Sequence, residues 1–151
     1  MALHESGHAA TITTFGGRVP SVHVKPTGGL TRWRGDLSRE QHAVIALSGY
    51  ASEEAHGGIY LGPVEEGLRR FHTGYIGRDD LTRVLGLAVT EEMVRPALRE
   101  LERLYGLAFD LVQRLGPVIL PIAARLMEVD RLHGEELAEL LQPEEAQCRS
   151  A

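Results

Sequence analysis

Cysteine and lysine are almost missing from this sequence, and each shortage excludes something. Cys148 is the only cysteine among 151 residues, so the chain cannot form an internal disulfide, and nothing points to an oxidising compartment. Lys25 is the only lysine, which excludes ordinary Schiff-base chemistry unless that residue supplies it. No GxxxxGK[ST] segment occurs either, so we do not expect these residues to bind ATP.

Long hydrophobic runs are also missing. The longest apolar stretch, residues 115–127, is interrupted by two prolines and an arginine and is too short to span a bilayer. Met1 leads into polar, histidine-rich sequence instead of a signal peptide. The formal net charge of −5 argues against a nucleic-acid-binding module, which usually has a basic face. We therefore expect a soluble, cytoplasmic chain with no membrane segment and no nucleic-acid partner.

The composition that remains, 43% hydrophobic and 25% charged, is that of one ordinary globular domain. Apolar residues spaced three and four apart predict a mainly helical fold, with helices over residues 3–15, 38–55, 90–114, 116–128 and 135–141. A further helix should begin at Asp79 and Asp80, after a long loop over residues 59–77. Near the N-terminus we predict a small β-hairpin of residues 19–26 and 30–33, with a turn at Thr27, Gly28 and Gly29.

One motif in the first predicted helix indicates a catalytic metal site. His4, Glu5 and His8 form the pattern HExxH, and residues four apart on a helix share one face. Two imidazoles placed in this way can bind one zinc ion, Zn²⁺, and lower the pKa of a water on it. Glu5 is close enough to take a proton from that water and pass it to the leaving amine of a peptide bond. The alternative is that both histidines are polar residues on the helix surface, although the apolar residues that follow favour burial.

A catalytic zinc site usually has three protein ligands and an open position. The sequence offers several candidates for the third ligand, namely Asp79, Asp80, Glu53, Glu54, His56 and His72. Glu53 and Glu54 can instead support the histidines by hydrogen bonds, and the two aspartates can simply favour a helix N-terminus.

Five segments of the chain, in order, resemble the peptidase domain of the FtsH-type ATP-dependent zinc metalloproteases. They are HESGHA (4–9), VHVKPTGGLTRW (22–33), LSGYASEEAHGG (47–58), HTGYIGRDDLTRV (72–84) and RLHGEELAELL (131–141). The resemblance covers nearly the whole chain. It implies an FtsH peptidase-domain-like helical fold over residues 1–142. The polar composition of residues 143–151 predicts a C-terminal tail. The resemblance also implies that Asp80, which precedes Leu81, is the third zinc ligand.

The predicted hairpin has a functional interpretation as well. Gly28, Gly29 and Leu30 lie where an edge strand would run beside the zinc site, and such an edge can hold an extended substrate by main-chain hydrogen bonds. The alternative is an ordinary hairpin without contact to substrate.

We therefore expect a zinc metalloendopeptidase that cleaves unfolded proteins or peptides, with Glu5 as the general base. The alternative is a non-catalytic FtsH-like scaffold or interaction module, against which the intact Glu5 argues. Proteins of this family carry a membrane anchor and an ATPase domain before the peptidase domain, and neither is present here. If these residues work with a separate ATPase as partner, the resemblance implies a hexameric ring. If they work alone, they can cleave only peptides or segments that are already unfolded. Met1 lies three residues before His4, which fits a start inside a longer frame or a chain adapted to begin there.

Overall fold

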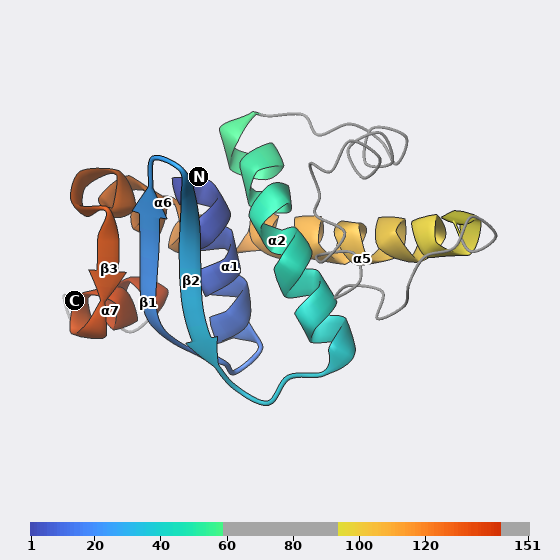
Figure 1. Ribbon diagram of the computed structural model, residues 1–151, viewed down its shortest axis with the longest axis horizontal. Coiled ribbons are helices and arrows are strands. Elements are labelled where there is room, and N and C mark those ends of the chain that lie inside the picture. The colour runs from blue at the N-terminus through green and yellow to red at the C-terminus, as the bar shows by residue number, and fades with distance from the viewer. Residues whose placement is uncertain (59–93, 143–151) are drawn as a thin grey trace, which may run out of the picture.

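The computed structural model describes residues 1–58 and 94–142. Their elements, in chain order, are α1 (Ala2–Thr14), β1 (Arg18–Lys25), β2 (Gly28–Arg34), α2 (Arg39–Gly57), α5 (Val94–Arg114), α6 (Gly116–Val129), β3 (Arg131–His133) and α7 (Gly134–Leu141) (Figure 1). This confirms the prediction of a mainly helical fold with a small sheet near the N-terminus. The helix expected at Asp79 and Asp80, the loop over 59–77 and the tail over 143–151 lie outside the described residues.

Helix α1, which carries the HExxH motif, lies at the centre of the described structure. It contacts β1 and β2 on one side and packs against all four other described helices (Figure 1). The helix ends as its glycines predict. Gly16 has a φ of +85°, and the N–H groups of Gly16 and Gly17 donate to the carbonyls of Thr13 and Ile12 at 2.9 Å each. This is the glycine-terminated C-cap in which two otherwise unpaired carbonyls of the last turn are satisfied.

The three strands form an antiparallel sheet in the order β2-β1-β3, so β1 is central and β2 is an edge strand of this sheet. Strand β2 is longer than predicted because the turn contains only Pro26 and Thr27, and Lys25 pairs directly with Gly28. Gly28 and Gly29 therefore belong to the strand and not to the turn. Strand β3 was not predicted at all. It pairs with β1 through Leu132, which lies opposite Val22, and both side chains are fully buried.

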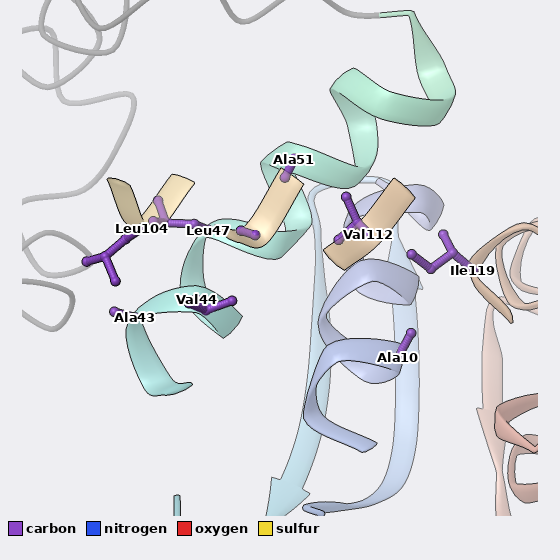
Figure 2. Close-up of a cluster of buried hydrophobic side chains, with 9 residues drawn as sticks. Ala10, Ala43, Val44, Leu47, Ala51, Leu104, Val112 and Ile119 are labelled. Atoms are coloured by element: carbon purple, nitrogen blue, oxygen red, sulfur yellow. The ribbon is translucent and has the colours of Figure 1, made fainter. Parts of the chain in front are cut away.

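Two clusters of buried side chains hold these elements together, and α1 contributes to both. The first joins α1, α2, α5 and α6, and Figure 2 labels eight of its members, Ala10, Ala43, Val44, Leu47, Ala51, Leu104, Val112 and Ile119. The second lies under the sheet and joins it to α1, α6 and α7, with Ile12, Val22, Ile122, Leu126, Leu132 and Leu137 among its members. Because α1 is fixed on two sides, the side chains on its remaining face have a defined position.

Helix α2 starts where the sequence places its cap. The Ser38 hydroxyl accepts a hydrogen bond from the Gln41 N–H at 3.2 Å, and the Gln41 side chain accepts one from the Ser38 N–H at 2.8 Å. This reciprocal pair satisfies two donors at the helix start.

Among the described helices, none alone has the length and apolar composition of a membrane span. One bent pair, α5 from Arg99 with α6, meets the length and composition criteria jointly, with a 79° change of direction at the break.

Candidate functional site

Helix α1 brings His4, Glu5 and His8 to the wall of one cavity. The two imidazole centroids lie 4.7 Å apart, with the ring planes at 85°. The cavity has a volume of about 710 Å³ and lies between β2 and α2, with α1 as its floor. Its other lining side chains come from α1, β2, α2 and the connection between the two latter elements, and include Ile12, Thr31, Trp33, Leu37, Ile45 and Tyr50. Imidazole, carboxylate and apolar surface thus share one concave space.

The imidazole of His8 is held in one tautomer by the backbone of α2. Its Nδ1 lies 2.7 Å from the carbonyl oxygen of Ile45, which can only accept a hydrogen bond, so Nδ1 carries the proton and Nε2 keeps its lone pair. The Ser48 hydroxyl also donates to that carbonyl at 2.7 Å. Burial, with the nearby charge of His4, lowers the pKa of His8 to about 3. His8 is therefore neutral near pH 7, which is the state that binds metal.

His4 is held in the same way by a side chain of α2. Its Nδ1 lies 3.3 Å from Oε2 of Glu53. The hydrogen bond with His4 lowers the pKa of Glu53, so this carboxylate is the acceptor and Nδ1 of His4 is the donor. The Tyr50 ring meets the same imidazole edge to face, with the centroids 4.7 Å apart. The sequence left Glu53 open as a zinc ligand or as a hydrogen-bond partner of a histidine. In the structure its carboxylate is hydrogen-bonded to Nδ1 of His4.

Gly49 of α2 lies directly against the His4 ring. A Cβ at this position would be 2.6 Å from both Cδ2 and Nε2 of His4 and 2.7 Å from Cε1. Three nearly equal distances place that point over the ring face. The imidazole therefore lies flat against the α2 backbone, at a distance that only glycine allows.

Glu5 is nearly inaccessible, with 5% of its surface exposed. The Thr31 hydroxyl of β2 lies 2.7 Å from Oε2 of Glu5, within donating distance, and burial raises the pKa of Glu5 above the ordinary carboxyl value. Strand β2 passes close to this carboxyl group, since a Cβ at Gly29 would lie 2.4 Å from Oε1. A buried carboxylate with a raised pKa is a better proton acceptor than one in water, which suits the role predicted for Glu5.

The remaining predicted site residues are distributed as follows. Glu54 faces away from the cavity and accepts a hydrogen bond from the Tyr105 hydroxyl of α5. His56 contacts α5 as well, with Nε2 2.9 Å from the Val112 carbonyl oxygen. Leu30 and Gly29 line the cavity, whereas Gly28 stands at the start of β2. Asp80, Asp79 and His72 lie outside the described residues.

Two of the expected zinc ligands fit the structure by their chemistry. His4 and His8 each have Nδ1 occupied by an oxygen acceptor and Nε2 available, which is the usual arrangement around a metal-binding histidine. Within residues 1–58 and 94–142, no cluster of three or more His, Cys, Asp or Glu side chains is placed to hold a metal ion. The described residues thus supply two candidate zinc ligands that lie together, the imidazoles of His4 and His8.

Several residues of this site were not found from the sequence. Thr31, Tyr50 and the Ile45 carbonyl act through contacts between elements distant in the chain, which no local pattern reveals. Gly49 did leave a signal, because a glycine inside a helix costs stability and often marks a close approach. Comparison with known proteins adds nothing to these contacts, since no protein-family model and no curated protein matches the sequence.

Proposed function

We propose that this protein is a zinc-dependent metalloendopeptidase of the FtsH-like type that cleaves unfolded proteins or peptides. The observation that carries the proposal is the arrangement on α1. Two imidazoles with engaged Nδ1 atoms share one cavity with a buried carboxylate of raised pKa. In this proposal the three residues supply two of the three protein ligands that a catalytic zinc ion usually has, and the general base of peptide hydrolysis.

In this proposal His4 and His8 hold zinc through their Nε2 atoms, and Asp80 is the third ligand on the strength of the family resemblance. When bound, the ion polarises the carbonyl of the scissile peptide and lowers the pKa of a water molecule. Glu5 takes a proton from the attacking water and returns it to the leaving nitrogen. Thr31 holds Oε2 of Glu5, which leaves Oε1 for the proton.

The cavity and the edge of the sheet are suited to bind an extended polypeptide as substrate. Strand β2 is an edge strand of the described sheet and borders the cavity at Gly29 and Thr31. A polypeptide added along such an edge is bound through its main chain, which requires an unfolded segment. Ile12, Trp33 and Ile45 give the cavity an apolar wall that suits a large apolar side chain of the substrate.

The wider context is part of the same proposal. Folded substrates would need a separate ATPase to unfold them, and a hexameric ring is the assembly that the resemblance implies. A cytoplasmic location agrees with the single cysteine of the chain.

The deciding experiment combines metal content with peptide-bond cleavage. We expect one zinc ion per chain by elemental analysis and cleavage of a denatured protein that a chelator abolishes. Glu5→Gln should retain zinc but lose cleavage, because glutamine cannot accept the proton. Asp80→Asn should lose both zinc and cleavage. Glu102→Gln, on the exposed side of α5, is the matched control and should cleave normally.

Two results would contradict the proposal. Cleavage by Glu5→Gln at the wild-type rate would exclude Glu5 as the general base. Stoichiometric zinc binding without turnover of any denatured protein or peptide would favour the non-catalytic scaffold instead.

A further inference from the structure

The outer face of the sheet, turned away from α1, has a regular arrangement of side chains. The pairing places Arg131, His23 and Leu30 in one row across the three strands. The next row on this face, two residues along each strand, contains His133, Ser21 and Arg32. The alternate row, with Val22 at its centre, points into the core. In Figure 1 the strands lie in front of α1, with this face toward the viewer.

Every ionisable side chain of the sheet is basic. The strands contain Arg18, His23, Lys25, Arg32, Arg34, Arg131 and His133, and no aspartate or glutamate. All of these except His23 are exposed. The nearest acidic residue along the chain is Asp130, immediately before β3. Because the whole chain has a net charge of −5, this face stands out against an acidic molecule.

The cations of the sheet also differ from two arginines of the helices, because those two are paired with carboxylates. Arg103 of α5 pairs with Glu100 and Glu40, and Arg125 of α6 pairs with Glu128 and Glu136. No basic side chain of the three strands forms an ion pair with any carboxylate in residues 1–58 and 94–142. Arg103 and Arg125 of the helices are therefore neutralised by carboxylates, whereas no cation of the three strands has such a partner among the described residues.

The pKa of His23, at the centre of the face, is affected by the same excess of positive charge. Burial lowers its pKa, and the next causes are the positive charges of Arg131, Arg32, Lys25 and His133. Its Nε2 is buried without a hydrogen-bond partner among the described residues. An anionic group on this face would relieve repulsion among several cations at once.

The position of the face indicates which anion it fits. Along β2, Thr31 and Trp33 line the cavity, whereas Arg32 and Arg34, which alternate with them, are exposed and do not line it. Leu30, 51% exposed, lies at the cavity as well. A polypeptide that follows the β2 edge toward the cavity would place alternate side chains beside Arg32 and Arg34. A nucleic acid or an anionic bilayer would extend beyond the three strands and meet the remainder of a chain whose net charge is −5.

We propose that the outer face of the sheet, through Lys25, Arg32, Arg34 and Arg131, binds an acidic stretch of polypeptide. The acidic stretch would be a part of the substrate outside the cleaved segment. Only this link to cleavage rests on the proposed peptidase function, since the binding itself needs no catalysis.

The test measures binding of two fluorescein-labelled peptides by anisotropy. One peptide has glutamate at alternate positions, and the other has glutamine at the same positions. We expect wild-type protein and Glu5→Gln to bind the glutamate peptide about tenfold more tightly than the glutamine peptide, with the difference lost at roughly 0.5 M salt. Arg32→Glu with Arg131→Glu should abolish the difference. Arg99→Glu with Arg114→Glu, exposed on α5, is the matched control and should preserve it.

The outcomes separate this inference from the proposed function. Equal binding of the two peptides, or equal loss in both double variants, would overturn it, and so would tighter binding of a single-stranded oligonucleotide or of phosphatidylserine vesicles. Arg32→Gln with Arg131→Gln checks that lost binding comes from lost charge, with circular dichroism to verify folding. Selective binding of the glutamate peptide by a protein that cleaves nothing would support the face and contradict the peptidase.

Discussion

Gly49 determines how closely α2 approaches the His4 imidazole, and a single methyl group tests this contact. In Gly49→Ala the new Cβ would lie 2.6 Å from Nε2 of His4, so the ring or the helix must move. We expect zinc affinity to fall by about tenfold or more, as for other residues that orient a metal ligand. Competition with a chromophoric chelator measures this affinity.

The control for this change is Gly106→Ala in α5. A Cβ at Gly106 would meet nothing within 4 Å, and the position is exposed within a helix. Alanine there should raise the free energy of unfolding by about 0.5–1 kcal/mol and leave zinc affinity unchanged. If both variants weaken zinc binding equally, the close contact at Gly49 does not orient His4.

Thr31 makes a second prediction about a single residue. Thr31→Val keeps the shape of the side chain but removes the hydroxyl that lies 2.7 Å from Oε2 of Glu5. With the carboxylate no longer held, we expect kcat to fall by about tenfold with little change in KM, since one hydrogen bond to a charged group is lost. Thr31→Ser should restore most of kcat, as measured by steady-state cleavage of a fluorogenic peptide. An equal loss in the serine variant, which keeps the hydroxyl, would mean that the hydrogen bond to Glu5 does not account for the effect.

Strand β3 is the smallest element, and its one buried side chain should account for most of its contribution to stability. Leu132 is fully buried in the cluster under the sheet. We expect Leu132→Ala to lower the free energy of unfolding by about 2–5 kcal/mol. Met127→Ala, at a side chain 79% exposed on α6, should change it by less than about 0.5 kcal/mol. Urea denaturation measures both, and a cost below about 1 kcal/mol for Leu132 would mean that β3 contributes little.

The helices and the hairpin follow from local sequence, whereas β3 does not. The Ser38 cap, the glycines after α1 and the three-and-four spacing of α5 each act within one or two turns, so the sequence predicts these elements closely. Strand β3 has three residues and becomes a strand only by pairing with β1, more than a hundred residues earlier. Short segments with a single apolar residue have no periodicity to detect.

The candidate site divides in the same way. The imidazole pair and Glu5 follow from helical spacing, because all three lie within one stretch of α1. The groups that orient them, such as Thr31 and the Ile45 carbonyl, come from β2 and α2, and only tertiary packing brings them near. The sequence could not predict which of two adjacent glutamates belongs to the site. Glu53 is hydrogen-bonded to His4, whereas Glu54 accepts a hydrogen bond from Tyr105.

At the scale of the whole molecule, α1 connects the sheet to the helices, so a ligand on α1 should stabilise all of them. Zinc at about 100 times its Kd should add about 2.7 kcal/mol to the free energy of unfolding, if the unfolded chain does not bind it. Thermal denaturation with zinc and with a chelator measures the shift. His8→Ala should have the same Tm with zinc as with a chelator. Zinc that binds without raising Tm would mean that α1 unfolds independently of the rest.

The close contacts around the site have a consequence for the tolerance of the chain to substitution. Gly7, Gly29 and Gly49 each place a neighbouring side chain within 2.6 Å of where a Cβ would stand. At Gly29 that side chain is Glu5 and at Gly49 it is His4, so there is no room for a further carbon atom beside the carboxyl group or the imidazole; at Gly7 it is Ser52 of α2. In a saturation library selected for function, these positions should retain glycine alone, whereas position 106 should accept most residues. A deep mutational scan would in this way outline the site without any ligand.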